Sequence, residues 1–255
     1  MPVALGADLA VYVLVLGRAG GLVATAPLLS SNAMPMPVRA LLSALLALGV
    51  TPAVAAPAGT VPGQLLPYAG LLLREVGIGA LLGFLAQVVL AAAQLAGAYC
   101  DVELGLTLGA VADPLQGTPV TVWSEWFGLL GTLVFVAGGG LEVLAEVLAL
   151  SYRHLALGGG ALFLGGGVEA ALGALGWAMV TGLGLAAPLL ALGFLLSLLL
   201  GAASRAMPQM NALQSVLPAQ LLVALTVLLV ALPGVVAGFG RLAPEVLVWV
   251  GRLWG

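Results

Sequence analysis

The sequence contains no lysine, one cysteine and one histidine, and each shortage excludes a class of chemistry. Without lysine the chain cannot form a Walker A phosphate loop or a lysine Schiff base. Cys100 cannot form a disulfide within the chain, and His154 cannot belong to a multi-histidine metal centre. These shortages argue against a P-loop ATPase and the common metalloenzymes, and we expect no cofactor.

Charge is equally scarce. Charged residues make up 7% of the 255 residues and hydrophobic residues 62%, whereas a soluble domain is about a quarter charged and about half apolar. The formal net charge of -3 leaves no basic stripe to neutralise phosphates, so we expect no nucleic-acid partner. No polar linker sets off a second, soluble domain. The composition therefore predicts one all-α, polytopic integral membrane unit.

The chain is rich in long apolar segments. Residues 170–204 and 206–240 are two charge-free runs of 35 residues each. At ~1.5 Å per helical residue each run could reach ~50 Å, well beyond a ~30 Å hydrocarbon core. The third segment along the chain carries Gly79-x-x-x-Gly83, a spacing that lets two helix backbones approach closely. About six apolar helices are predicted in all, the first four at about 9–29, 38–55, 71–99 and 126–150, with the fourth interrupted at Gly138–Gly140.

Residues 101–124 combine acidic residues, prolines and glycines, and we expect them to be irregular. Their centre is apolar and punctuated by glycine. Non-helical backbone at membrane depth survives only where it is buried in protein or lines a cavity. The centre therefore suits either a plug that seals by packing and dewetting or a surface hairpin loop. The candidate plug residues are Leu106, Thr107, Leu108, Gly109, Ala110, Val111, Ala112, Asp113 and Pro114.

Ionisable side chains inside membrane-length segments are costly, so each marks a candidate site. Arg18 lies in the first predicted segment and Glu75 in the third. Glu142 and Glu146 lie four residues apart in the fourth segment and share one helical face. These groups could line a proton or substrate path, form an ion pair, or contact a partner subunit, and a solvated face also explains the two glutamates. No segment carries the row of carboxylates that a proton relay needs.

A polar island at residues 204–211 separates the two long apolar runs. Pro208 breaks a helix, the amides of Gln209 and Asn211 can satisfy the freed backbone groups, and Arg205 can extend toward water. The island is explained equally well as a polar turn and as a docking or gating site within an assembly.

Four blocks of residues follow one another along nearly the whole chain. They are Arg18 with Ala24–Ser30 and Pro35–Arg39, then Arg74–Phe84 continuing to Ala96 and Gly97, then Leu104–Leu106 with Asp113, Pro114 and Gly117, and last Arg205–Asn211 with Pro218. In this order and at these spacings they resemble the FliR family of flagellar export-gate proteins, whose counterparts in injectisomes are called SctT. The stretch 208–211 favours the flagellar side.

The resemblance implies a non-enzymatic role. Family members assemble with FliP- and FliQ-like subunits into a helical gate that passes unfolded protein substrates, together with FlhA- and FlhB-like export components. The resemblance places such a protein among the lipids of the bacterial inner membrane, in the flagellar basal body. It also implies tilted, bent hairpins within one domain, residues 1–255, with a FliP-like part followed by a FliQ-like part.

The resemblance also assigns roles to individual residues. The family's plug loop corresponds to about 106–119, where Leu108 and Val111 stand in place of the bulkier aromatic residues common in the family. Roles in assembly or structure are implied for Arg18, Pro27, Glu75, Gly79, Gly83, Gly97, Arg205, Pro208, Gln209 and Asn211.

Two other functions stay open from the residues alone. A small-solute secondary transporter would need two related halves around a polar midplane site. Its support is the likeness of 31–37 to 204–210, which agree at four of seven positions. An intramembrane enzyme would need a metal motif or a nucleophile with its base, and neither is recognisable in the sequence.

Overall fold

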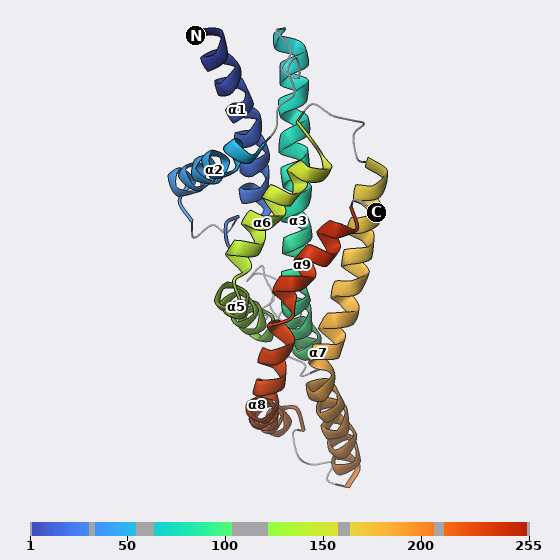
Figure 1. The fold of residues 1–255 in the computed structure, drawn as a ribbon. Coiled ribbons are helices and arrows are strands. Elements are labelled where there is room, and N and C mark those ends of the chain that lie inside the picture. The colour runs from blue at the N-terminus through green and yellow to red at the C-terminus, as the bar shows by residue number, and fades with distance from the viewer. Residues whose placement is uncertain are drawn as a thin grey trace, which may run out of the picture. The chain divides into compact units, whose positions relative to one another are not determined.

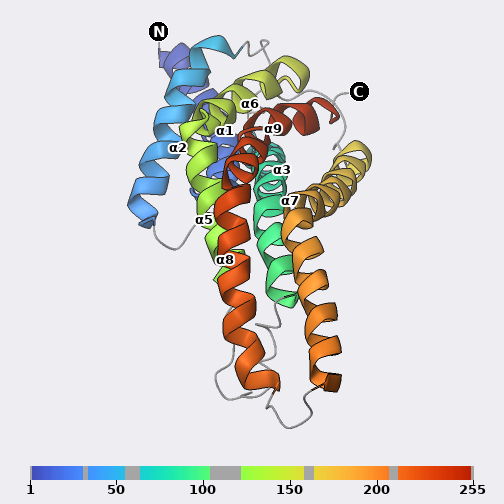
Figure 2. The ribbon, with the colours of Figure 1, turned by 90° about the horizontal axis from the view of Figure 1, so that it is seen from below.

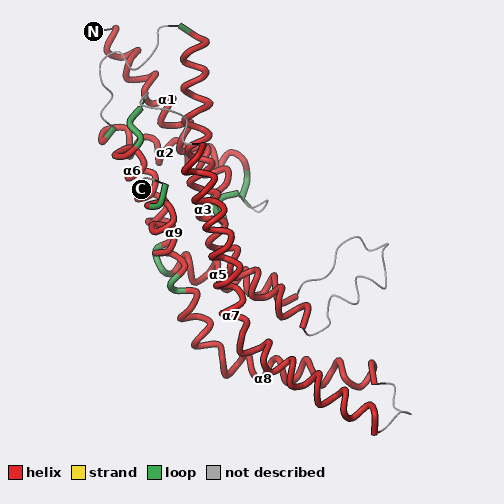
Figure 3. Tube along the Cα trace, turned by 90° about the vertical axis from the view of Figure 1, so that its right-hand side faces the viewer, coloured by secondary structure: helices red, strands yellow, loops and turns green. Residues whose placement is uncertain are grey.

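The computed structural model describes residues 2–30, 34–54, 64–103, 122–157, 164–206 and 212–253. Every regular element in these stretches is a helix, which confirms the predicted all-α class (Figure 3). The helices are α1 (Pro2–Thr25), α2 (Met36–Val50) with the short 3-10 helix η1 (Thr51–Ala53), α3 (Leu65–Glu103), α5 (Val122–Ala137), α6 (Gly140–His154), α7 (Leu164–Ala206), α8 (Ala212–Phe239) and α9 (Leu242–Gly251).

Within the described residues, three helical stretches are long and apolar enough to cross a membrane: Leu65–Glu103, Gly166–Leu199 and Leu225–Gly251. Helices α5 and α6 together count as a fourth, broken span. The shorter apolar helices are Leu9–Thr25 and Met36–Val50. Each of the six predicted apolar segments thus contains a helix among the described residues, but only three or four of them reach membrane length.

The chain divides into two compact units, each built from separate stretches of sequence. The first unit comprises Met1–Val89, Gly138–Leu175 and Ala243–Gly255, and it holds α1, α2, α6, most of α9 and the first parts of α3 and α7. The second comprises Leu90–Ala137 and Gly176–Leu242, and it holds α5, α8 and the remainder of α3 and α7.

In the first unit α1 packs on both α2 and α3 (Figure 1). The hydroxyl of Tyr12 on α1 donates a hydrogen bond to the carbonyl of Ala44 on α2, at 3.2 Å. The hydroxyl of Tyr68 on α3 donates to the carbonyl of Ala10 on α1, at 3.0 Å. The core of this unit is aliphatic, with Leu14, Val15, Leu22, Leu82 and Leu85 fully buried.

In the second unit α5 packs beside α8 (Figure 2). The rings of Phe127 on α5 and Phe239 on α8 meet edge to face, with centroids 5.9 Å apart, and Trp123 stacks edge-on against Phe127 at 6.3 Å. Such edge-to-face pairs contribute more than their buried area alone. A Cβ at Gly131 would lie 2.6 Å from the Cβ of Ala93, so α5 and α3 are also in close contact.

The end of α1 differs from the prediction. Helix α1 ends at Thr25 because Ala26 immediately precedes Pro27, and a residue before proline disfavours the α region. Leu28 then has a positive φ of 65°, and the N–H of Ser30 donates to the carbonyl of Ala26 at 3.0 Å, which closes the turn. The predicted end of this helix near Leu29 is wrong for that reason.

The irregular region predicted at 101–124 is wrong at both of its ends. Asp101–Glu103 continue α3, and Val122–Ser124 form the first turn of α5. The rest of the region, 104–121, lies outside the described residues, and so do the predicted plug residues at 106–114. The interruption predicted at Gly138–Gly140 is confirmed, since Gly139 adopts a φ of 79° there and caps the start of α6.

Candidate functional site

A buried arginine forms the centre of the first unit. Arg18 lies on α1, and neither its side chain nor that of Glu75 on α3 is exposed. The Nε of Arg18 donates to Oε2 of Glu75 at 2.6 Å, and its second terminal nitrogen lies 2.6 Å from the same oxygen. Of the explanations offered by the sequence, the structure supports the ion pair.

Residues at the end of α6, and Leu155 just beyond it, make the remaining contacts of the guanidinium. One terminal nitrogen of Arg18 donates to the hydroxyl of Ser151 at 3.0 Å, and the other donates to the backbone carbonyl of Leu155 at 3.1 Å. The ring of Tyr152 lies 3.8 Å from the guanidinium carbon, within range of a cation–π interaction. The hydroxyl of Ser151 in turn donates to the carbonyl of Leu148 at 2.7 Å. We call Arg18, Glu75, Ser151, Tyr152 and Leu155 the arginine cluster.

Close backbone contact between α1 and α3 brings Arg18 and Glu75 together. A Cβ at Gly79 would overlap the backbone carbonyl of Arg18, and one at Gly21 would overlap the carbonyl of Val76. Glu75 lies one turn before Gly79 and therefore on the same face of α3. The predicted close approach at the Gly-x-x-x-Gly motif is confirmed, and it is this approach that allows the carboxylate to reach the guanidinium.

The crossing continues one turn further along both helices. A Cβ at Gly83 would overlap the hydroxyl of Thr25 and lie 2.6 Å from the carbonyl of Leu22. That hydroxyl lies 2.9 Å from the carbonyl of Ala80 on α3 and 3.1 Å from the carbonyl of Gly21 on α1. Small residues thus hold the two backbones together along the length of the contact, as in membrane helix pairs.

The polar groups of the arginine cluster are not all satisfied. The second carboxylate oxygen of Glu75, Oε1, and the hydroxyl of Tyr152 are buried and make no hydrogen bond to any described residue. An unpaired buried polar group costs about 1–3 kcal/mol. Glu75 is the only carboxylate that directly contacts Arg18 among the described residues, and only one of its two oxygens accepts a hydrogen bond.

The arginine cluster links helices within the chain. A buried charge is tolerated where it is paired and hydrogen-bonded, and Arg18 ties α1 to both α3 and α6 in this way. No group of three or more histidine, cysteine or acidic side chains suited to a metal ion occurs among the described residues. Ser151, Tyr152 and Leu155 were missed by sequence reasoning, because they are more than 130 residues away from Arg18 and have no motif in common with it.

A second polar contact lies in the second unit, at the start of α5. Asp101 on α3 is fully buried. Its two carboxylate oxygens accept hydrogen bonds from the backbone N–H groups of Trp123 and Ser124, both at 3.0 Å. A carboxylate is well placed there, since the first N–H groups of a helix lack internal partners and carry partial positive charge. Asp101 thus joins the two helices that flank residues 104–121.

Gly97 belongs to the same contact. It lies one turn before Asp101, and a Cβ on it would overlap the backbone carbonyl of Trp123. The hydroxyl of Ser124 also donates to the carbonyl of Gln94 at 3.1 Å. The position implied for Gly97 in assembly or structure is therefore one of close contact between α3 and α5.

The remaining predicted site residues are spread over the molecule. Pro27 is buried in the turn after α1, and Arg205 lies in the last turn of α7. Glu142 and Glu146 are both exposed on α6, on the shared face that their spacing predicts. The island residues Pro208, Gln209 and Asn211 lie outside the described residues.

Comparison with known proteins identifies relatives in two kinds of bacterial system. Flagellar biosynthetic protein FliR of Escherichia coli (strain K12) is 29% identical over 142 residues, which are 56% of this chain and 54% of that protein. Surface presentation of antigens protein SpaR of Shigella sonnei is 26% identical over 160 residues, 63% of this chain and 61% of that protein. The matched stretches cover less than two thirds of each relative.

A family model covers much more of the chain. The model described as bacterial export proteins, family 1, matches residues 9–246. That range includes every member of the arginine cluster, the Asp101 contact and all the helices that could cross a membrane except the end of the last one. The chain belongs to family 1 of the bacterial export proteins.

Proposed function

We propose that this chain is a structural and gating subunit of the flagellar type III protein export gate. The observation that carries the proposal is the match to the export-protein family over residues 9–246. A flagellar FliR and a SpaR protein among the relatives support a role in type III export. The four sequence blocks, and residues 208–211 in particular, favour the flagellar system.

In this proposal the long helices α7 and α8 carry surfaces for other subunits. Within an apolar eighteen-residue stretch of each, only 22% of residues are buried, and large side chains such as Val180 at 72% and Val230 at 80% are exposed. Exposed apolar area of this extent needs lipid or protein against it. FliP- and FliQ-like subunits cover these faces in the assembled gate, and FlhA- and FlhB-like components act beside it, in the inner membrane at the basal body.

The proposed role of the arginine cluster is structural rather than catalytic. Arg18 touches one carboxylate, one hydroxyl, one carbonyl and one ring, and each of these contacts holds a helix in place. Gly79, Gly83 and Pro27 serve the same unit by fixing the path of α1 over α3. Arg205, Pro208, Gln209 and Asn211 form a docking junction between α7 and α8. The chain needs no catalytic chemistry of its own, because it forms part of a passage for unfolded protein.

The proposed plug is Leu106–Pro114, in the segment between α3 and α5. Asp101 supports this placement, since it holds the start of α5 against the end of α3 and so fixes where the segment leaves and returns. Deleting Leu108–Ala112 should make the assembled gate leak ions, measured as closed-state conductance in a planar bilayer, without loss of assembly. An unchanged conductance in the assembled variant contradicts the plug.

Co-purification tests the proposal as a whole. The full chain, co-expressed with FliP- and FliQ-like subunits of the same bacterium, should elute with them as one complex in detergent. Exposed Arg153 on α6 provides a matched control, because Arg153→Gln should leave the complex intact. If the unmodified chain never enters a stable complex with such subunits, the proposal is wrong.

A further inference from the structure

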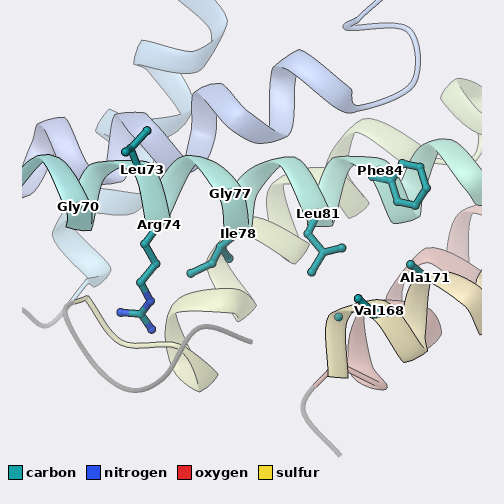
Figure 4. A pocket seen from close by; sticks show the side chains of 10 residues that line it. Gly70, Leu73, Arg74, Gly77, Ile78, Leu81, Phe84, Val168 and Ala171 are labelled. Atoms are coloured by element: carbon teal, nitrogen blue, oxygen red, sulfur yellow. The ribbon is translucent and has the colours of Figure 1, made fainter. Parts of the chain in front are cut away.

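An apolar groove runs along the first unit between α3 and the beginning of α7. It has a volume of about 480 Å³. Figure 4 shows Arg74, Ile78 and Leu81 projecting from the same side of α3, with Val168 and Ala171 of α7 facing the end of the groove at Leu81 and Phe84. Phe84, at the far end, is 40% exposed. None of the residues that form the wall of the groove is part of the arginine cluster.

The groove is long and narrow. Its α3 wall extends from Gly70 to Phe84, a separation of fourteen residues along the helix, or about 21 Å at ~1.5 Å per residue. Dividing the volume of 480 Å³ by that length gives a mean cross-section of about 23 Å². A helix about 10 Å across has a cross-section of about 80 Å². The space therefore suits one extended hydrocarbon chain and is too slender to enclose a helix.

Charge in the groove is confined to one end. Arg74 is the only charged residue among those that form its wall, and it lies one turn from Gly70. The remaining wall residues are glycine, alanine, leucine, isoleucine, valine and phenylalanine. Basic pockets between membrane helices bind anionic lipid headgroups. An apolar track with one cation near its end is complementary to an acyl chain that carries a negative headgroup.

We propose that the groove binds one anionic phospholipid, with an acyl chain along α3 and the phosphate headgroup at Arg74. Burying methylene groups along Ile78, Leu81 and Phe84 supplies the apolar part of the binding free energy. Arg74 supplies the preference for a negative headgroup. The site depends only on the first unit and stands independently of the proposed role in protein export.

Gly77 gives the sharpest test of the acyl-chain track. It is part of the groove wall, and a Cβ on it would meet no atom within 4 Å, so a larger side chain there begins in open space beside the groove. Gly184 on α7 is equally open but is not part of the groove wall, which makes Gly184→Phe the matched control. Binding of dioleoylphosphatidylglycerol to the full chain in detergent, followed by native mass spectrometry, should weaken at least about tenfold in Gly77→Phe and stay unchanged in Gly184→Phe.

Arg74 tests the headgroup separately. The unmodified chain should bind dioleoylphosphatidylglycerol about fivefold more tightly than dioleoylphosphatidylcholine, as one nearby arginine predicts. Arg74→Gln should abolish that preference while leaving phosphatidylcholine binding unchanged, whereas Arg153→Gln, at an exposed position on α6, should preserve it.

Two outcomes overturn the proposal. One is equal binding of both lipids by the unmodified chain. The other is lipid binding by Gly77→Phe that matches Gly184→Phe. If Gly77→Phe keeps its lipid but no longer joins FliP- and FliQ-like subunits, the groove receives partner side chains instead, and the lipid site is wrong while the proposed function stands.

Discussion

Helices α3 and α7 each contain an apolar stretch of eighteen residues with a mean hydropathy of 2.2, yet 61% of that stretch is buried in α3 and only 22% in α7. The first part of α3 packs against α1 through glycines and carries the buried Glu75, whereas α7 presents large apolar side chains on its surface. Apolarity therefore does not determine which of these helices is the more buried. A buried charge that needs a partner, that of Glu75, distinguishes α3 from α7.

The difference has a physical basis in the membrane. Lipid chains are as apolar as leucine, so burying leucine between helices gains little there, and packing and polar contacts determine which helices associate. The crossing of α1 and α3 supplies both. Helix α7 also approaches α3 closely at Gly182, where a Cβ would lie 2.9 Å from the carbonyl of Ala92, but the large apolar side chains on its surface are left for lipid or for other proteins to cover.

The largest predicted effect is at Arg18. Replacing it with methionine leaves the carboxylate of Glu75 buried without its cation, which should lower the free energy of unfolding by about 3–5 kcal/mol. The double variant Arg18→Met, Glu75→Gln should recover most of this loss, because the uncompensated charge is gone. Thermal unfolding in detergent, followed by circular dichroism, measures both variants. If Arg18→Met is no less stable than the exposed control Arg153→Gln, the cluster does not hold the crossing together.

Gly79 should be the next most sensitive position. In Gly79→Ala the new Cβ overlaps the carbonyl of Arg18, so α1 and α3 must separate, and stability should fall by about 1–3 kcal/mol. Gly77, two residues earlier on the same helix, has open space, and Gly77→Ala should be neutral or stabilising by up to about 1 kcal/mol. Equal thermal stability of the two variants would contradict the backbone contact.

In the second unit, Asp101 joins α3 to α5 through a polar contact. Asp101→Ala removes the acceptors for two backbone N–H groups and should cost about 1–2 kcal/mol, as loss of a helix cap does. Hydrogen exchange at Trp123 and Ser124 should accelerate. Glu125→Gln removes an exposed carboxylate from the same first turn and should leave that exchange nearly unchanged. Slow exchange in Asp101→Ala would show that the contact is dispensable.

The smallest predicted effect is on the surface of α8. Val230 is 80% exposed, and Val230→Ala should change the stability of the isolated chain by no more than about 0.5 kcal/mol. Leu228, two residues earlier, is 6% exposed, and Leu228→Ala should cost at least about 2 kcal/mol. Unfolding of both variants in detergent provides the measurement. A large loss in Val230→Ala would mean that this face is covered within the chain.

Sequence patterns predicted the helices better than their ends. The apolar segments and the break at Gly139 follow from composition and from a residue that tolerates positive φ. The end of α3 and the start of α5 could not be predicted from sequence patterns, because an aspartate such as Asp101 is typical of loops. In the structure its carboxylate accepts hydrogen bonds from N–H groups in the first turn of another helix. A polar residue within a helix can be satisfied by a distant segment that no local rule includes.

The candidate site was half predicted. Arg18 and Glu75 were identified because charges are rare in apolar segments, and Gly79 and Gly83 were identified by their spacing. Nothing in the sequence connected these two pairs to each other or to Ser151. The connection arises from packing, since the glycines set the distance at which the two charged side chains meet.

By itself, the sequence determined that the chain is all-helical and membrane-embedded, because so few charges and so many long apolar runs admit no other class. It also determined which residues would be costly to bury. Only the tertiary structure decided how that cost is offset: α1, α3 and α6 converge on Arg18, and α3, not the equally apolar α7, is the more buried helix. Hydropathy is a property of single side chains, whereas burial depends on which backbones can approach each other.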